Sequence, residues 1–273
     1  MRIAIAAALL AASSLALADT TPDLVDELFG ILNTGGPAND PLKIKPPRLV
    51  LDRQVAVAPA NYTTVVDQPI NEDNVAVAKQ TTIAKSADGT ATWIALDYDL
   101  RALCAKASCD KDPPVGNGHM AALFDAAQPI AWDNATAGGK AARKLVTAPV
   151  TIDRKVDPGA ADADKLFEAT LGDPAAFAKA ISDRKDAVML GSDPGERFVG
   201  GTAIRAQLAK WKLAFKLRDG VQAGATSSAT VAFVAANIDA AKSGAKPTAY
   251  RVFAIYEKTN GTWQVVLLQF SNR

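Results

Sequence analysis

The stretch Tyr250–Val266, YRVFAIYEKTNGTWQVV, contains the most informative local pattern in the chain. Two runs rich in β-branched and aromatic residues flank Asn260-Gly261, the dipeptide that favours a tight two-residue hairpin turn. We therefore predict a hairpin with strands over Ala249–Lys258 and Thr262–Phe270. A further strand-like run over Ala229–Ile238 precedes it, so the end of the chain is predicted to be a three-stranded antiparallel meander.

Residues 162–215 are predicted to contain three helices and one hairpin. Helical spacing of apolar residues, aspartate at a helix start and proline at the first helical position support the helices. The predicted elements are a helix over Asp162–Leu171, a helix capped by Asp173 that starts at Pro174 and carries Phe177, a hairpin turn over Gly191–Gly195, and a helix over Thr202–Phe215 with Thr202 as its cap.

This order of elements resembles the NTF2-like superfamily, and its SnoaL-like branch in particular. Asp186–Arg197, DAVMLGSDPGER, followed by Gly200–Ile204, GGTAI, is similar to the hairpin that leads through a glycine into the third helix of that fold. The closing hairpin, with Trp263 after a glycine turn, is similar as well. The resemblance covers residues 162–273 and implies an α+β fold, a curved antiparallel sheet wrapped by helices into a cone.

Residues 48–150 are predicted to form a mostly β domain before the cone. This region contains a weak internal repeat of the C-terminal strands. The aligned segments are Thr92–Asp99 with Ala232–Asp239, His119–Asp125 with Tyr250–Tyr256, and Trp132 with Trp263. One interpretation is a degenerate second copy of the NTF2-like unit, and the other is a chance resemblance between sheets rich in alanine and valine.

The beginning of the chain is predicted to be an export signal. Residues 1–18 combine a basic start, an apolar run and the sequence Ala16-Leu17-Ala18, which predicts cleavage after Ala18 and a periplasmic or secreted protein. The alternative is an uncleaved anchor. Residues 19–47 are predicted to form a short helix and a linker. No other apolar run reaches spanning length, so we expect no stable membrane anchor.

The charge balance argues against a nucleic-acid partner. The chain has 30 basic and 29 acidic residues, and the predicted signal contains one of the bases, Arg2. Phosphate backbones require a basic stripe, which the sequence lacks. Cys104 and Cys109 are predicted to form a local disulfide after export, with a redox-active pair as the alternative. Because His119 is the only histidine, we expect no metal site, and no motif indicates a cofactor.

The NTF2-like resemblance implies a conical pocket, which would suit a small, flat, apolar ligand. Arg251 could contact an anionic ligand group, or it could pair with Glu196 and so orient the turn. The alternative is that Arg251 and Glu196 form only a weak salt bridge at the rim of the pocket. The residues predicted to line this pocket are Phe177, Trp211, Phe233, Arg251, Phe253 and Glu196.

The NTF2-like superfamily also includes isomerases and cyclases. In its ketosteroid-isomerase branch the general base is an aspartate, and the resemblance places that position on Gly191 or Ser192 of this chain. Asp193 and Asp186 are therefore the remaining candidates for a general base. The sequence therefore favours a non-enzymatic role, either small-molecule binding or protein association. Val265, Leu267 and Tyr256 are expected to form an exposed apolar patch on the open sheet face, through which a homodimer could form. The alternatives are a SnoaL-type isomerase or cyclase that uses an aspartate base, and a structural envelope protein whose N-terminal half docks onto a partner.

Overall fold

The structure, a computed structural model, describes most of the chain after residue 73 and two short strands before it. The described residues are 48–51, 54–56, 74–102, 114, 116–126, 128–137, 152–193, 195–242 and 244–272. The predicted signal at residues 1–18, the predicted helix and linker at residues 19–47, and both Cys104 and Cys109 lie outside them. Within the described part, no helix has the length and apolar character needed to cross a membrane.

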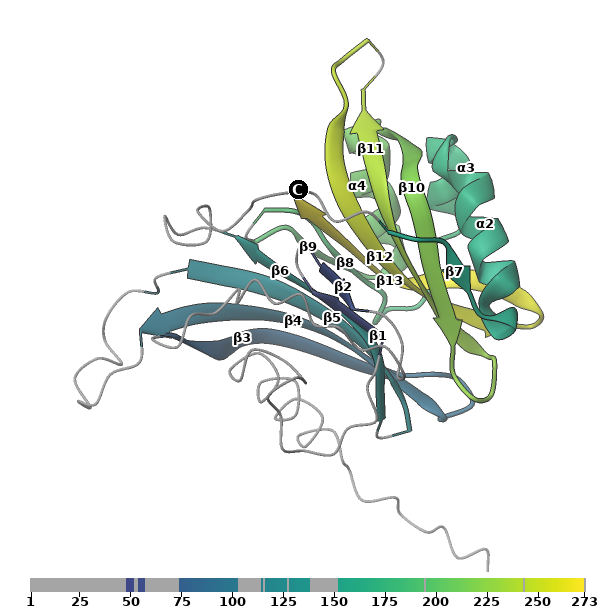
Figure 1. Cartoon of the computed structure of the whole chain (residues 1–273), viewed down its shortest axis with the longest axis horizontal. Coiled ribbons are helices and arrows are strands. Elements are labelled where there is room, and N and C mark those ends of the chain that lie inside the picture. Colours follow the sequence, from purple (N-terminus) through teal and green to yellow (C-terminus); the bar gives the residue numbers. More distant parts are fainter. Residues whose placement is uncertain are drawn as a thin grey trace, which may run out of the picture.

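The first half of the chain forms a six-stranded sheet, here called the N-terminal sheet (Figure 1). Its spatial order is β2-β1-β6-β5-β4-β3, and all neighbours are antiparallel except β1 and β6. The strands are β1 (Arg48–Leu51), β2 (Gln54–Ala56), β3 (Asn74–Lys85), β4 (Ala91–Ala102), β5 (Gly116–Asp125) and β6 (Gln128–Ala137).

The second half forms a seven-stranded sheet, the C-terminal sheet, with the order β7-β10-β11-β12-β13-β8-β9. A long antiparallel meander makes its centre. The strands are β7 (Lys155–Val156), β8 (Val188–Leu190), β9 (Arg197–Val199), β10 (Ala214–Ala225), β11 (Val231–Ala241), β12 (Thr248–Thr259) and β13 (Thr262–Asn272). The helices beside it are the 3₁₀ helix η3 (Pro158–Ala160), α2 (Ala161–Leu171), α3 (Pro174–Lys179) and α4 (Gly201–Trp211).

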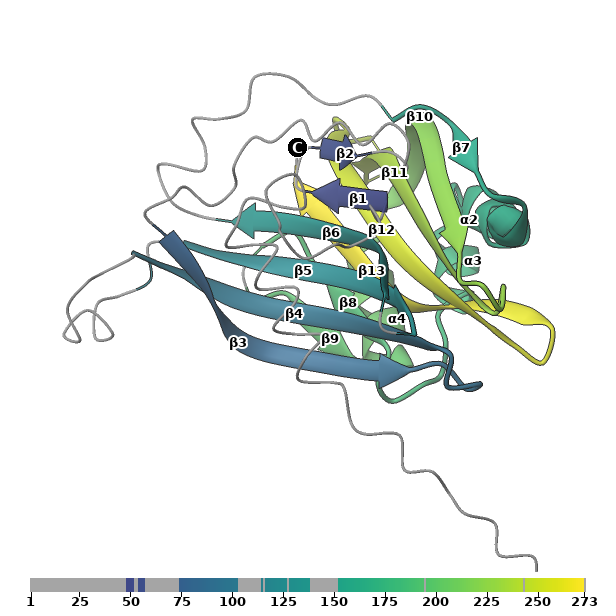
Figure 2. The ribbon, with the colours of Figure 1, turned by 60° about the horizontal axis from the view of Figure 1, so that its bottom comes forward.

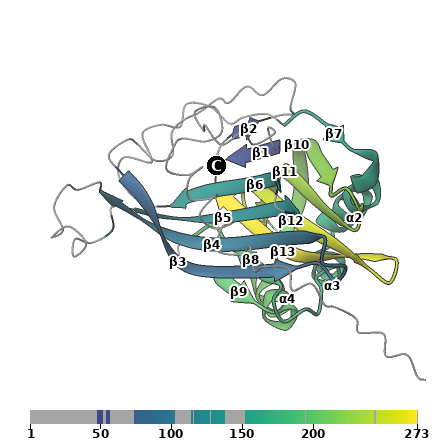
Figure 3. The same cartoon turned by 90° about the horizontal axis from the view of Figure 1, so that it is seen from below.

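The C-terminal sheet lies between the helices and the N-terminal sheet (Figure 2). Strand alternation divides its side chains between two cores. On β12, Val252 and Ala254 pack in the core beneath the helices, whereas Phe253 and Ile255 pack in a core shared with the N-terminal sheet. Figure 3 shows the N-terminal sheet lying over the strands of the C-terminal sheet. Both faces of the central strands are therefore buried.

The element order predicted for residues 162–273 is confirmed, with two corrections. Helix α4 ends at Trp211, where Lys212 adopts a left-handed conformation, so Phe215 belongs to β10 and not to a helix. The sequence analysis missed this strand, and the meander has four long strands instead of three. Gly200 and not Thr202 is the residue before the helix, because α4 begins at Gly201.

The prediction that Val265, Leu267 and Tyr256 form an exposed patch is wrong, because all three are buried. Val265 and Tyr256 pack beneath the helices, and Leu267 packs between the sheets. The pairing of β12 with β13 is irregular between Ile255 and Tyr256, where Val266 is an extra residue. Such a bulge changes the face on which the following residues lie, so simple alternation misplaces them.

The meander β3–β6 repeats the strand order of the meander β10–β13. The turn before β4 and the turn before β11 contain the same pair of backbone hydrogen bonds, each 2.9 Å long: Ser86 N to Ala91 O with Gly89 N to Ser86 O, and Thr226 N to Val231 O with Ala229 N to Thr226 O. The irregularity between β5 and β6, at Leu123 and Phe124, also corresponds in place to the one between β12 and β13.

Strand pairing corrects the residue alignment of this repeat. Asp97 pairs with His119 as Asn237 pairs with Arg251, so His119 corresponds to Arg251, one residue beyond the Tyr250 of the sequence alignment. Trp132 corresponds to Leu268 and not to Trp263. A one-residue slip matters in a sheet because it exchanges the two faces.

Candidate functional site: the cone pocket

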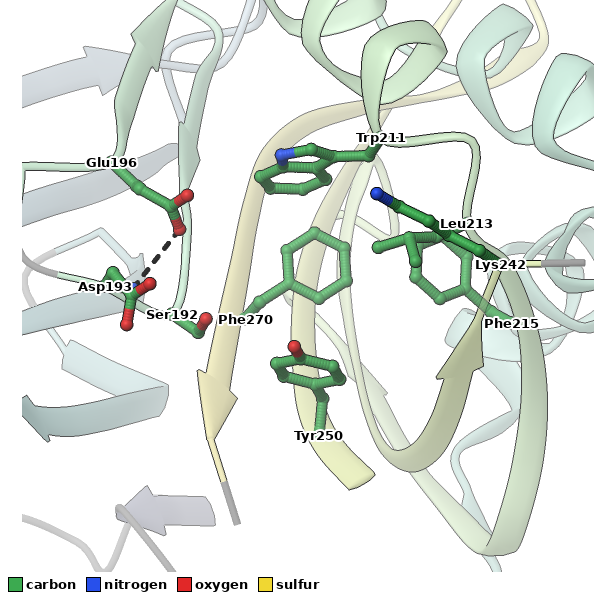
Figure 4. A pocket seen from close by; sticks show the side chains of 9 residues that line it. All are labelled: Ser192, Asp193, Glu196, Trp211, Leu213, Phe215, Lys242, Tyr250 and Phe270. Atoms are coloured by element: carbon green, nitrogen blue, oxygen red, sulfur yellow. Dashed lines mark hydrogen bonds between the residues drawn. The ribbon is translucent and has the colours of Figure 1, made fainter. Parts of the chain in front are cut away.

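A pocket of about 250 Å³ opens between the helices and the end of the C-terminal sheet (Figure 4). It lies where the β8–β9 turn, the end of α4 and the ends of the long strands come together. Its lining residues are Ser192, Asp193, Glu196, Trp211, Leu213, Phe215, Lys242, Tyr250 and Phe270.

Aromatic rings form the wall of this cone pocket. Phe270 is central, because its ring contacts those of Phe215, Trp211 and Tyr250 with centroid distances of 5.5, 5.8 and 6.4 Å. The first pair is stacked and the other two are edge-on, which are favourable arrangements for aromatic pairs. The rings therefore hold one another in place, and the wall suits a flat apolar group.

The polar side of the pocket belongs to a single turn, residues 191–196, here called the pocket turn. Gly191 N donates to the Glu196 carbonyl at 2.7 Å, and Asp193 N donates to Glu196 Oε2 at 3.2 Å. A Cβ atom at Gly191 would lie 2.2 Å from Glu196 Oε2, so only glycine leaves room for the carboxylate there. The turn thus fixes the direction of the Glu196 side chain.

The pocket turn makes this side of the cavity negative. Burial raises the pKa of Tyr250, the negative charges of Asp193 and Glu196 raise it further, and a hydrogen bond with Ser192 acts in the opposite direction. Among the described residues, the ion pairs include neither Asp193 nor Glu196. Lys242 lies on the opposite side of the pocket, beyond the aromatic rings (Figure 4).

The structure places three of the six predicted lining residues near this cavity. Trp211 and Glu196 line it, and Phe177 lines an adjoining crevice that also includes Trp211 and has no room for a water molecule. Phe233 and Phe253 do not line the cone. They stack between the two sheets, with centroids 6.0 Å apart. Alternation correctly groups residues on one face, but it does not say which face the helices cover.

Arg251 is also on the inter-sheet face, which corrects its predicted place in the pocket. Its Nε lies 3.0 Å from Oδ1 of Asp133 on β6, and neither side chain is exposed. Gln269 and Ser271 donate to the other carboxylate oxygen of Asp133, at 2.7 and 2.9 Å. Burial raises the pKa of Asp133, and the charge of Arg251 and these hydrogen bonds act against it. Arg251 does not pair with Glu196.

The two candidate bases lack the surroundings that proton abstraction requires. Asp193 lines the pocket but is exposed, so it is not desolvated. Asp186 is outside the lining and accepts hydrogen bonds from Nε and Nη2 of Arg184, both at 2.7 Å. These bonds lower the pKa of Asp186. Neither carboxylate therefore has the desolvated environment of a general base.

The sequence analysis missed most of the pocket wall, namely Leu213, Phe215, Lys242, Tyr250 and Phe270. These residues lie at or next to the ends of strands. The sequence did not show which face of each strand lies beneath the helices. Phe215 and Leu213 were hidden by the overlong helix prediction. The available signal was the position of Tyr250 and Phe270 at neighbouring strand ends, which a hairpin brings together. No group of three metal-ligating side chains occurs among the described residues.

Neither a protein-family model nor a curated protein matches the sequence. Similar solved structures include an NTF2-like protein of unknown function from Pseudomonas putida KT2440, with 17% identity over 41% of this chain and 84% of that chain, and a TM-score of 0.35. A putative ketosteroid isomerase from Parabacteroides distasonis ATCC 8503 has 15% identity, covering 41% and 85%, with a TM-score of 0.35. An NTF2-like protein from Cytophaga hutchinsonii ATCC 33406 has 14% identity, covering 41% and 94%, with a TM-score of 0.33.

Two of these structures are described as NTF2-like proteins and one as a putative ketosteroid isomerase. The confirmed order of helices, hairpin and meander is the layout that the resemblance noted in the sequence implies.

Proposed function

We propose that the cone pocket binds a small, flat, largely apolar molecule, with its polar end against the pocket turn. The observation that carries this proposal is the set of four aromatic rings around one cavity, with polar groups confined to its two ends. Ligand pockets are typically about 300–1,000 Å³. A volume of about 250 Å³ is just below that range, so a two-ring compound is the appropriate size.

The charges of the pocket favour a cationic group on such a ligand. Asp193 and Glu196 are on one side, and the aromatic rings that line the same pocket can attract cations through their faces. Among the described lining residues the one cationic side chain is that of Lys242, which is exposed and lies on the opposite side (Figure 4). An ammonium group would therefore lie beside the pocket turn, with its apolar part against Phe270.

Binding is preferred over the isomerase or cyclase alternative because of the state of the candidate bases. Asp193 is exposed and Asp186 is held by Arg184, so neither of these two candidate carboxylates is set up to abstract a proton. The third alternative, a structural protein with a docking N-terminal half, has less support, since the inner face of the N-terminal sheet is already buried against the C-terminal sheet.

Calorimetric titration of the full chain with 1-naphthylmethanol tests the proposed function. We expect saturable binding at one site. Trp211→Ala removes one wall of the pocket and is expected to weaken binding at least about tenfold, the effect of roughly 1.4 kcal/mol. Val199→Ala is the control, because Val199 is a large exposed apolar residue away from the pocket lining. Absence of saturable binding, or equal affinities of wild type and Trp211→Ala, contradicts the proposal.

We also propose that the N-terminal sheet is a degenerate second copy of the NTF2-like unit. Equivalent turns and bulges support this, and so do reciprocal contacts between the copies. Ala87 N donates to Glu257 at 2.6 Å, and the equivalent Ser227 N donates to the equivalent Asp125 at 2.7 Å. Such exchange of identical contacts is typical of a two-fold interface. In this chain the interface lies within one molecule.

The partner and location of the protein follow from these points as proposals. The sheet face expected to serve a homodimer is covered by the chain's own N-terminal sheet, so a homodimer would use another surface.

Export to the periplasm or the exterior, with cleavage after Ala18, is proposed from the composition of residues 1–18. N-terminal sequencing of the mature protein tests it: a start at Asp19 supports export, and a retained Met1 contradicts it.

A further inference from the structure

His119 of β5 connects the N-terminal sheet to the pocket turn. His119 is almost fully buried, and its Nε2 lies 3.1 Å from the backbone oxygen of Asp193. Its Nδ1 lies 2.5 Å from Oδ1 of Asp97 on the neighbouring strand β4. The imidazole ring therefore connects a carboxylate of the N-terminal sheet to the backbone of the turn that lines the cone pocket.

A second connection begins from the same carboxylate. Nη1 of Arg197, the first residue of β9 after the pocket turn, donates to Oδ2 of Asp97 at 2.9 Å. Its Nη2 donates to Thr82 Oγ1 at 2.5 Å and to the Ala95 carbonyl at 3.2 Å. The carboxylate of Asp97 thus holds His119 with one oxygen and Arg197 with the other.

These two connections hold the pocket turn at Asp193 and at Arg197, the residue that directly follows the turn. The intervening residue Glu196 is tied to the same points, because its N–H donates to the Asp193 carbonyl at 3.1 Å. Displacement of Asp193 would therefore move the Glu196 carboxylate as well. Both carboxylates at the negative end of the pocket depend on this arrangement.

We propose that His119 is a positioning residue of the cone pocket, which orients the pocket turn for ligand binding through the Asp193 carbonyl. The inference rests on the proposed function, because it gives a residue outside the lining a role in ligand affinity. It also gives the N-terminal sheet a purpose, since a lone C-terminal unit would lack this support.

The two contacts of His119 provide a test that separates positioning from simple packing. Its ring nitrogens both face acceptors, a carboxylate oxygen of Asp97 and the backbone carbonyl oxygen of Asp193. Support of the turn requires a hydrogen-bond donor at the Asp193 carbonyl, whereas packing requires only a side chain of suitable volume. Loss of the donor is therefore expected to loosen the turn.

The experiment measures the affinity of the full chain for 1-naphthylmethanol at neutral pH. In His119→Gln a single amide nitrogen replaces two ring nitrogens that face different acceptors, so this variant is expected to bind about three- to tenfold more weakly, the effect of about one hydrogen bond. Asp97→Asn is a second variant and is expected to weaken binding as well, because it removes the charge that holds both His119 and Arg197.

Asp125→Asn is the matched control. Asp125 also contacts the opposite sheet, through Ser227, but it is not part of the pocket or of the His119 network. This variant is expected to keep the wild-type affinity. Wild-type affinity in His119→Gln, with unchanged amide signals in the pocket turn, overturns the inference.

A second readout makes the result independent of ligand binding. The amide NMR signals of Gly191 and Glu196, whose N–H groups bond within the pocket turn, are expected to shift between the wild type and His119→Gln and to stay unchanged in Asp125→Asn. If these signals shift but the probe does not bind, the proposed function fails and the positioning role stands. If the probe binds but neither signals nor affinity depend on His119, the positioning role fails alone.

Discussion

Arg251 on β12 and Asp133 on β6 form an ion pair across the two sheets, with 3.0 Å between Nε and Oδ1 and no exposure of either side chain. Buried pairs contribute little net stability compared with apolar replacements, but removal of one partner leaves an uncompensated charge. This pair therefore makes the two sheets depend on each other.

Arg251→Met is predicted to lower the free energy of unfolding by about 3–5 kcal/mol at neutral pH. The reason is that Asp133 would remain buried without its cation. Addition of Asp133→Asn should recover part of the loss, since the amide is neutral and can keep hydrogen bonds with Gln269 and Ser271. Urea unfolding of the three proteins measures this. A loss below about 1 kcal/mol in Arg251→Met would mean that the pair is unimportant for stability.

Stability in acid is predicted to depend on Asp97. Burial alone would raise the pKa of Asp97, but the hydrogen bond from His119 and the charge of Arg197 outweigh it and hold the pKa below the ordinary 3.8. A lowered folded-state pKa contributes stability above the unfolded value of about 3.9, and this contribution disappears as pH falls through the folded value.

Thermal unfolding between neutral pH and about pH 2 checks this linkage. Asp97→Asn should be less stable than the wild type at neutral pH, and the difference should shrink as the solution becomes acidic. Asp193→Asn is the comparison, because Asp193 is exposed and forms no ion pair among the described residues. An equal stability difference at every pH would contradict the role given to the Asp97 charge.

The charge of the ligand is predicted to affect affinity in a fixed order. Three compounds with the same ring system, 1-naphthylmethylammonium, 1-naphthylmethanol and 1-naphthoate, present a cation, a neutral group and an anion. Because Asp193 and Glu196 form the negative end of the pocket, the cation should bind most tightly and the anion least. The cationic preference should decrease in Asp193→Asn and with added salt. A preference for the anion would assign the polar contact to Lys242 instead.

Gly191→Ala is predicted to weaken binding of the cation without unfolding the protein. The added Cβ would lie 2.2 Å from Oε2 and 2.6 Å from Cβ of Glu196, so this side chain must move away from Asp193 N. We expect about threefold to tenfold weaker binding of 1-naphthylmethylammonium, the effect of one displaced charged contact. Gly172→Ala has open space around its added Cβ and an ordinary φ of −79°, so it serves as the substitution control for stability. Unchanged affinity in Gly191→Ala would remove Glu196 from the site.

The local signals of the sequence predicted most of the C-terminal fold. Asp173 accepts hydrogen bonds from Ala175 N and Ala176 N as a helix cap should, and Asn260-Gly261 forms the predicted turn. Strand β10 was missed because the apolar pattern of α4 continues to Phe215, while the left-handed Lys212 that ends the helix has no distinctive sequence signal.

The pocket was less predictable because its residues depend on long-range contacts. Alternation grouped Phe233 and Phe253 correctly, yet a second sheet covers that face, and no local pattern shows where this sheet lies. His119 and Asp193 are 74 residues apart, and their contact depends on the packing of the two sheets. Glu196 and Trp211 were found because the NTF2-like resemblance places the turn and the helix end at the cone.

The most direct test of the central claim is an NMR titration of the full chain with 1-naphthylmethylammonium. The account predicts shifts of the Trp211 indole N–H and of the backbone amides of the pocket turn. The indole N–H signals of Trp93, between the sheets, and Trp132, which is also buried away from the cone pocket, should stay unchanged. Absence of any shift up to the highest ligand concentration that can be reached, or shifts confined to the N-terminal sheet, would contradict a ligand site in the cone.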